Sequence, residues 1–261
     1  MPKILNNQTL LIIAAFVLVL VLLASFNSYA SQYRANIKTI HVINLDKDED
    51  RMAHIKSTTT NLALPVERWS ATYGKDLTAE QMAEQGVGYA MTSSGTGPYT
   101  KRSMNRNLGA VGCFLSHKTL IERLSTLDMP DHYGHLILED DITIPQNLLT
   151  SDGVWASVRY QIPLDWDVVY LDIVAPQGTS LSNNIMKLKY KPNGNWGTHA
   201  YIVRHGAIKK KVLPWLSHMI DAIDEQYNRK FSTWNVYAVV PGIITLDPVL
   251  SCVEKSSIQQ M

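Results

Sequence analysis

Residues 134–145, GHLILEDDITIP, bring an apolar segment directly up against three consecutive carboxylates. Residues 135–138 have the length and apolar character of a buried strand, and turn-forming residues flank the stretch. We therefore expect Glu139, Asp140 and Asp141 to lie at the carboxyl end of that strand.

Three adjacent carboxylates repel each other, and the arrangement is costly unless a cation or an array of N–H donors shares the site. Magnesium or manganese typically takes one or two protein carboxylates and completes its octahedron with waters and phosphate oxygens of the substrate. The triplet therefore predicts Mn²⁺ or Mg²⁺ beside a diphosphate group. A solvated acidic turn is the alternative that the triplet alone leaves open.

Apolar strands and amphipathic helices alternate along most of the chain. Strands are expected at 38–45, 66–71, 135–138, 167–173, 198–203, 236–240 and 243–246, and helices after Asp48 or Asp50 and at 108–127, 148–160, 206–216 and 221–229. This order predicts a three-layer α/β domain with a mostly parallel sheet, whose ligands bind at the carboxyl ends of the strands. Long loops are expected at 86–107, as a basic lid or a solvated insertion, and at 176–197.

The amino-terminal part predicts a membrane anchor. Residues 10–26 form an apolar, uncharged run of 17 residues. This length is at the lower limit of what crosses a bilayer. We expect a short tail at 1–9, a transmembrane signal anchor at 10–26, a stem at 27–37 and the functional domain at 38–261. A retained anchor predicts a single-pass protein whose domain lies in the lumen of the Golgi or endoplasmic reticulum. Cleavage after Ala30 would instead give a secreted protein.

Charge and cysteine content narrow the function classes. The chain has 24 Lys and Arg against 23 Asp and Glu, so its net charge is close to zero. This balance gives no indication that a nucleic acid is the partner. Two cysteines, Cys113 and Cys252, are too few for a disulfide framework. They could pair in an oxidising lumen, or Cys113 could be a buried free thiol in its helix.

Two further segments contain candidate binding residues. The turn after the first strand places Asn44 and Arg51 near the strand end, and Arg51 could hold a phosphate or pair with Asp48 on the surface. Gly109 and Gly112 each cost about 1 kcal/mol relative to alanine inside a helix. They therefore predict close approach of another backbone or a ligand near the helix start.

Five sequence blocks resemble glycosyltransferase family 25, which includes bacterial lipooligosaccharide galactosyltransferases and collagen hydroxylysine galactosyltransferases. The blocks are VINLDKDEDRM at 42–52, LGAVGCFLSHKTL at 108–120, LILEDD at 136–141, DWDVVYLD at 165–172 and GTHAYIVRHGA at 197–207. Two positions depart from the family pattern. Lys47-Asp48 replaces a basic pair, and Asp172 stands where glycine is common.

The resemblance implies a GT-A type fold, a UDP-sugar donor and inversion at the anomeric carbon. It implies that the EDD triplet is the family's version of the metal-binding DxD motif, with Glu139 and Asp141 as metal ligands. It also implies a set of residues on the donor side: Asn44, Arg51, Gly109, Gly112, Ser116, His117 and Asp140. His117 has the alternative reading of a packed, hydrogen-bonded helix residue.

The expected reaction is metal-dependent transfer of a hexose, galactose or glucose, to a hydroxyl group of a glycan or a protein. A carboxylate must accept the proton of that hydroxyl group. We expect Asp224 in this role, with Asp221 and Asp172 as alternatives, although Asp224 could also be an exposed helix acid. The rival functions are a catalytically silent binder of nucleotide-sugars or glycans, and a phosphohydrolase that splits UDP-sugars.

Overall fold

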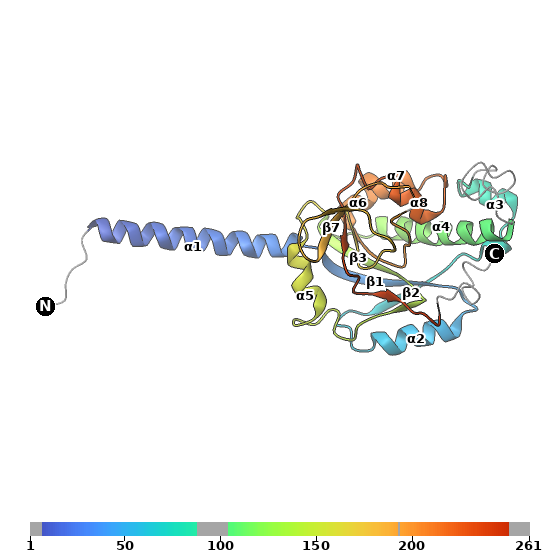
Figure 1. Cartoon of the computed structure of the whole chain (residues 1–261), viewed down its shortest axis with the longest axis horizontal. Helices are drawn as coiled ribbons and strands as arrows, with labels where there is room; N and C mark the ends of the chain where they lie inside the picture. Colours follow the sequence, from blue (N-terminus) through green and yellow to red (C-terminus); the bar gives the residue numbers. More distant parts are fainter. Residues whose placement is uncertain (1–6, 88–103, 193, 251–261) are drawn as a thin grey trace.

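The computed structural model describes residues 7–87, 104–192 and 194–250 (Figure 1). Its centre is an eight-stranded sheet with the order β2-β1-β3-β8-β5-β9-β7-β6. The strands of this sheet are β1 (Asn36–Asn44), β2 (Val66–Ser70), β3 (Tyr133–Glu139), β5 (Val168–Tyr170), β6 (Gly178–Ser180), β7 (Ile185–Leu188), β8 (Ala200–Arg204) and β9 (Val236–Val239). A separate antiparallel ribbon joins β4 (Ile142–Thr143) and β10 (Thr245–Leu246).

Most strands of the large sheet run in one direction. Parallel pairs join β1 to β2, β1 to β3 and β5 to β9. Only β8 and β7 oppose the others, because β8 is antiparallel to both β3 and β5, and β7 to both β9 and β6. The predicted mostly parallel sheet is confirmed, with the reversed β8 as an unpredicted detail.

Helices cover both faces of the sheet and complete the predicted three layers (Figure 1). They are α2 (Glu49–Thr59), α3 (Ala79–Glu84), α4 (Met104–Ser125), α5 (Val154–Val158), α6 (His205–Ala207), α7 (Leu213–Trp215) and α8 (Ile223–Asn228), with short helical turns η1 (Gly74–Asp76), η3 (Arg159–Gln161) and η4 (Ile208–Val212). The first helix, α1 (Asn7–Tyr33), lies apart from the sheet. The predicted helix at 206–216 is α6, η4 and α7 in succession, and η4 is a π-helical turn.

Two apolar cores lie on opposite faces of the sheet because side chains alternate along each strand. Ile137 of β3 packs with Phe114 of α4 and other side chains of the α4 and α8 layer. Its neighbours Leu136 and Leu138 pack with Ile55 and other side chains of the α2 and α5 layer. The strand is therefore buried on both sides, which explains its apolar run at 136–138.

The segment predicted as a loop at 176–197 contains the hairpin β6–β7 instead. Met186 of β7 pairs with Ala238 of β9, and β6 forms the outer edge of the sheet. All three residues of β6, Gly-Thr-Ser, are exposed. An exposed polar edge strand lacks the apolar alternation by which strands are recognised in a sequence, and the prediction failed for that reason.

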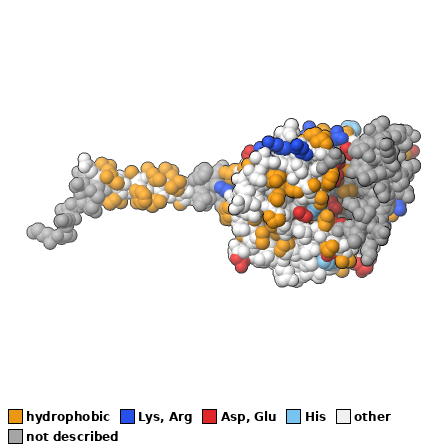
Figure 2. All heavy atoms as spheres, viewed as in Figure 1, with side chains coloured by type: hydrophobic (Ala, Val, Ile, Leu, Met, Phe, Trp, Pro, Cys, Tyr) orange, Lys and Arg blue, Asp and Glu red, His pale blue; other side chains and the backbone are white. Residues whose placement is uncertain are grey.

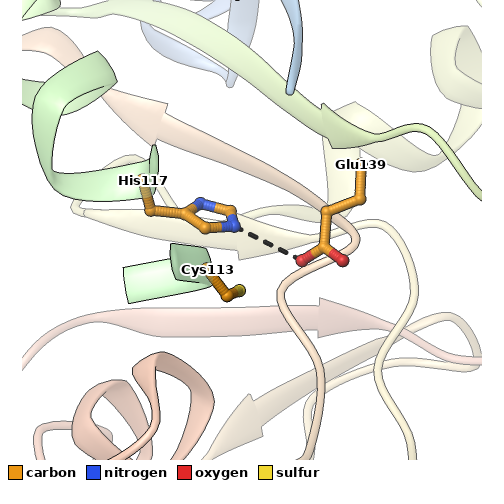
Figure 3. A group of neighbouring side chains, drawn as sticks. All are labelled: Cys113, His117 and Glu139. Atoms are coloured by element: carbon orange, nitrogen blue, oxygen red, sulfur yellow. Dashed lines mark hydrogen bonds and ion pairs between the residues drawn. The ribbon is translucent and has the colours of Figure 1, made fainter. Parts of the chain in front are cut away.

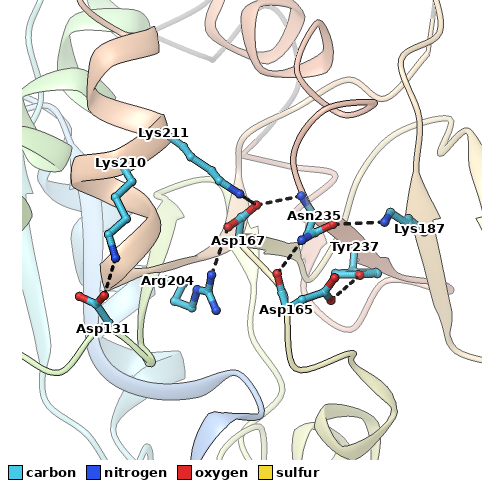
Figure 4. Close-up of polar contacts among 9 residues, drawn as sticks. All are labelled: Asp131, Asp165, Asp167, Lys187, Arg204, Lys210, Lys211, Asn235 and Tyr237. Carbon is cyan, nitrogen blue, oxygen red and sulfur yellow. Dashed lines mark hydrogen bonds and ion pairs between the residues drawn. The ribbon is translucent and has the colours of Figure 1, made fainter.

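Charged side chains meet at the buried carboxylate of Asp167 at the amino end of β5 (Figure 4). Asp167 is fully buried and accepts hydrogen bonds from the backbone N–H of Asn235 at 2.8 Å and from Lys211 Nζ at 2.5 Å. Arg204 lies 3.3 Å from the other carboxylate oxygen of Asp167. This cluster joins β5 to β8, β9 and the η4 turn at the end of the strand away from the acidic triplet.

Helix α1 extends away from the domain, and apolar side chains between residues 11 and 23 are exposed (Figures 1 and 2). Within the described residues, no helix combines the length and the hydropathy that a bilayer span requires. The predicted membrane anchor is therefore not supported, and the lumenal location stays a prediction.

Candidate active site

The acidic triplet lies where three strand ends meet. In the parallel pair of β1 and β3, Ile43 stands opposite Glu139, so Asn44 and the triplet share one edge of the sheet. Because β8 runs the opposite way, its start brings His199 to the same edge. The backbone N–H of Glu139 donates to the carbonyl of His199 at 2.9 Å. The predicted position of the triplet at a strand's carboxyl end is confirmed.

Asp140 is the structural member of the triplet. It is fully buried and points toward α2, where it accepts hydrogen bonds of 2.7 Å from Arg51 Nη1 and from Asn44 Nδ2. Burial raises the pKa of Asp140, while Asn44 and Arg51 oppose that rise. The side chains predicted at the nucleotide, Asn44 and Arg51, thus hold the triplet, and their contact with a nucleotide stays a prediction.

Glu139 points to the other face, toward α4. One carboxylate oxygen accepts a hydrogen bond from Thr198 Oγ1 at 2.9 Å and lies 3.3 Å from His117 Nε2. Burial alone would raise the pKa of Glu139, but His117, His199 and Thr198 together lower it. His117 is itself buried, with Nδ1 3.0 Å from the hydroxyl of Tyr201, so its ring is fixed in orientation.

Asp141 has an unused oxygen. Its Oδ1 is buried and makes no hydrogen bond to any described residue. Burial, together with the charge of Glu139, raises the pKa of Asp141 to about 7. A solvated acidic turn is excluded, because Asp140 and Asp141 are both buried. A buried carboxylate oxygen without a donor is instead the arrangement that a bound cation would stabilise.

His199 and Asp172 form a pair beside these carboxylates. His199 Nε2 lies 3.0 Å from Asp172 Oδ2. Burial alone would lower the pKa of His199, but Asp172 and the charges of Glu139 and Asp141 raise it. His199 was not predicted as a site residue. The sequence shows only a histidine near the start of the strand predicted at 198–203, and the direction of that strand is known from the structure alone.

Asp224 belongs to the same site. Its two carboxylate oxygens accept backbone hydrogen bonds from Gly197 at 3.2 Å and from Glu225 at 2.8 Å. Burial raises the pKa of Asp224, these bonds oppose the rise, and the charges of Glu225 and Glu139 add to it. Gly197 has φ +99°, and a Cβ there would lie 2.7 Å from His199 Nδ1, so this turn requires glycine.

Asp221, the alternative base, has another role. It is buried, and its Oδ2 accepts a hydrogen bond from Arg229 Nη2 at 2.7 Å. Its Oδ1 accepts a hydrogen bond from the backbone N–H of Ala222 at 3.0 Å, just before α8 begins. The structure therefore gives Asp221 an ion pair that fixes the start of α8 and leaves Asp224 as the carboxylate near Glu139.

The glycines and the serine of α4 position the helix. A Cβ on Gly112 would lie 2.7 Å from the carbonyl oxygen of Thr72 and 2.9 Å from the nitrogen of Gly74. Ser116 accepts a hydrogen bond from the backbone N–H of Thr72 at 2.8 Å and donates to the carbonyl of Gly112 at 2.6 Å. The predicted close approach is thus to another backbone segment. Gly109 is buried in the same helix.

Cys113 lies one turn before His117 on α4 and forms no disulfide within the described part of the chain. Burial raises the pKa of this thiol, and the charges of Glu139, Asp224 and Asp141 raise it further. The electrostatic potential around the sulfur is therefore negative. The predicted lid at 86–107 lies largely outside the described residues, as does Cys252.

Comparison with known proteins gives a family. The model of glycosyltransferase family 25 (LPS biosynthesis protein) matches residues 37–226. A glycosyltransferase 25 family member of Anopheles gambiae is 31% identical over 153 residues, which is 57% of this chain and 24% of that protein. Procollagen galactosyltransferase 1-A of Xenopus laevis is 29% identical over 132 residues, which is 51% of this chain and 20% of that protein. The matched parts thus span about a quarter or less of these relatives.

Proposed function

The chain belongs to glycosyltransferase family 25, and we propose that it transfers a hexose from a UDP-sugar to a hydroxyl group of a glycan or a protein. The observation that carries this proposal is the buried oxygen of Asp141 beside Glu139, at the carboxyl end of β3, which has no hydrogen-bond partner among the described residues. All of these atoms lie inside the matched residues 37–226. We propose galactose as the sugar because two relatives are named procollagen galactosyltransferases.

The site residues fit a divalent cation. Glu139 and Asp141 offer hard carboxylate oxygens of the kind that Mn²⁺ and Mg²⁺ prefer, and Asp141 Oδ1 has no other partner among the described residues. Such a cation supplies Lewis-acid stabilisation to the diphosphate of the leaving group. Asp140 is excluded as a ligand in this arrangement, because Arg51 and Asn44 occupy both of its oxygens.

Asp224 is the proposed general base. In a single displacement, the acceptor oxygen bonds to the anomeric carbon while the bond to UDP breaks, which inverts the configuration. The acceptor proton passes to the Asp224 carboxylate. Two backbone amides fix this carboxylate, and its raised pKa makes it a stronger base than an ordinary aspartate. His199, which Asp172 holds in place, brings an imidazole ring that can bind a proton close to the carboxylates of Glu139 and Asp141.

The test follows labelled sugar into an acceptor. The full chain is incubated with Mn²⁺ and labelled UDP-galactose or UDP-glucose, with procollagen chains or a glycan panel as acceptors. We expect acceptor-dependent incorporation, reduced about 100-fold or more in Asp224→Asn, since general-base catalysis contributes about 10²–10⁴. Sugar release without incorporation into any acceptor of the panel would indicate a phosphohydrolase, whereas slow release beside acceptor-dependent transfer is compatible with a transferase. Binding of UDP-sugar without turnover would indicate a silent binder.

A further inference from the structure

We propose that Cys113, His117 and Glu139 form a second cation site, which takes a borderline-soft divalent metal such as Zn²⁺. Cys113 and His117 lie four residues apart on α4, so both side chains project from one face of the helix. Glu139 reaches toward them from the end of β3 (Figure 3). The three donor atoms lie within 4.8 Å of one another, and no other group of at least three His, Cys, Asp or Glu side chains among the described residues meets this distance.

The spacing of two of these donors matches a shared metal. His117 Nε2 lies 3.3 Å from the nearer Glu139 oxygen, which is long for an N–H···O hydrogen bond. Zinc binds histidine nitrogen and carboxylate oxygen at about 2.0–2.1 Å in a tetrahedral arrangement, which separates two such ligands by about 3.3 Å. The pair therefore already stands at the separation that a tetrahedral ion requires.

The surrounding groups hold the ligands in place. The hydroxyl of Tyr201 lies 3.0 Å from His117 Nδ1, which leaves Nε2 directed at Glu139. Thr198 donates to the same Glu139 oxygen at 2.9 Å. Outer partners of this kind orient metal ligands and strengthen binding. The carboxylates of Asp141 and Asp224 also favour a cation here, because their charges act on the Cys113 sulfur.

The ligand types distinguish this site from the carboxylate site on Glu139 and Asp141. A thiolate with an imidazole favours zinc, whereas Mn²⁺ and Mg²⁺ favour oxygen ligands alone. Glu139 is common to both sets. Zinc at the Cys113 site would therefore occupy Glu139, which could then no longer bind the Mn²⁺ or Mg²⁺ of the UDP-sugar. Sugar transfer would be inhibited. This consequence, unlike the zinc site itself, rests on the proposed function.

The site is tested by metal binding to the full chain. We expect calorimetry to show one Zn²⁺ per chain, and Co²⁺ in its place to give a thiolate-to-cobalt charge-transfer absorption. Cys113→Ser should abolish that absorption. It should also weaken zinc binding by about 10–100-fold or more, because the loss of a residue that only orients a ligand already lowers metal affinity by that factor. Cys252→Ser removes the other thiol of the chain and is the matched control, which should behave as wild type.

His117→Gln is the second variant, and circular dichroism establishes that each variant is folded. It should weaken zinc binding while some thiolate absorption persists. Zinc affinity that is unchanged in both variants, or absorption that disappears in Cys252→Ser, would overturn the site. In transfer assays at fixed Mn²⁺, the rate of each protein is expressed relative to its own rate without zinc. Inhibition of Cys113→Ser should then require a higher zinc concentration than inhibition of wild type. Zinc binding without any sugar transfer would uphold the site and overturn only the proposed function.

Discussion

Arg51 Nη1 lies 2.7 Å from a carboxylate oxygen of Asp140, and both side chains are buried between β3 and α2. This ion pair, together with Asn44, neutralises the middle carboxylate of the triplet. Because side chains alternate along an extended backbone, Glu139 then points to the α4 face of the sheet. Three consecutive carboxylates can coexist here because they do not share one environment.

Breaking the Arg51–Asp140 pair should destabilise the fold. Arg51→Met leaves a buried carboxylate without its counter-charge, and we expect the free energy of unfolding to fall by about 3–5 kcal/mol. The measurement is urea denaturation followed by circular dichroism. The double variant Arg51→Met, Asp140→Asn should recover part of the loss, because it also removes the charge. Equal stability of Arg51→Met and wild type would contradict the structural role of Asp140.

Two aspartates near the amino end of β5, Asp167 and Asp131, differ in burial (Figure 4). Asp167 is completely buried, whereas Asp131 makes an exposed pair with Lys210 at 2.7 Å, with 69% of both side chains exposed. Asp167→Ala should lower the free energy of unfolding by about 3 kcal/mol or more. Asp131→Ala should change it by less than about 0.5 kcal/mol. Similar effects of the two variants in thermal denaturation would contradict this assignment.

His135 should make stability depend on pH. It is fully buried, with Nδ1 2.7 Å from Thr39 Oγ1 and Nε2 3.0 Å from His205 Nδ1. Burial, with the charges of His205 and His41, lowers its pKa to about 3. The unfolded chain therefore binds a proton at higher pH than the folded chain does. The stabilisation is fully present above about pH 6.5 and is lost as the pH falls toward 3.

The size of this effect can be measured against His135→Gln. From pH 7 to pH 5, we expect the stability advantage of wild type over the variant to shrink by about 2 kcal/mol, as linkage requires for these pKa values. Denaturation curves at both pH values give this difference. A constant difference would mean that the pKa of His135 is the same in the folded and unfolded chain. A growing difference would mean that folding raises this pKa. Either result would contradict the prediction.

Gly197 is predicted to couple backbone geometry to activity. Alanine at this position would be strained at φ +99° and would crowd His199 Nδ1. Because the N–H of Gly197 also holds Asp224, we expect Gly197→Ala to lower kcat by about tenfold or more, as small misplacements in active sites do. The conservative exchange Thr198→Ser keeps a hydroxyl for Glu139 and is the control. An unchanged kcat in Gly197→Ala would mean that the geometry of this turn does not affect catalysis.

The fold class and the place of the acidic triplet could be predicted because both depend on local patterns. Residues 136–138 are apolar without interruption, and the three carboxylates follow directly. Strand direction is not encoded locally, so the reversal of β8 and the arrival of His199 at the site were missed. The partner of Arg51 was missed for a similar reason, since Asp140 lies 89 residues away in the chain.

The choice between Asp224 and Asp221 shows the same limit. Both are acids near the start of one short polar helix, and the sequence alone leaves them equivalent. The distinction comes from the tertiary contacts, because Arg229 binds Asp221, whereas Gly197 binds Asp224 from the loop before β8. The structure brings His117 next to Glu139, a contact that depends on the packing of α4 against the sheet, and the part of His117 in donor binding stays a prediction.

In the proposed reaction, Asp141 holds the cation that neutralises the diphosphate of the UDP-sugar. The most direct measurement is the rate of UDP release from UDP-galactose and UDP-glucose by wild type, Asp141→Asn and the remote control Asp131→Asn, with and without Mn²⁺. We predict Mn²⁺-dependent release by wild type and Asp131→Asn, and a loss of about 100-fold or more in Asp141→Asn. Equal release without added metal, or full activity of Asp141→Asn, would contradict the account.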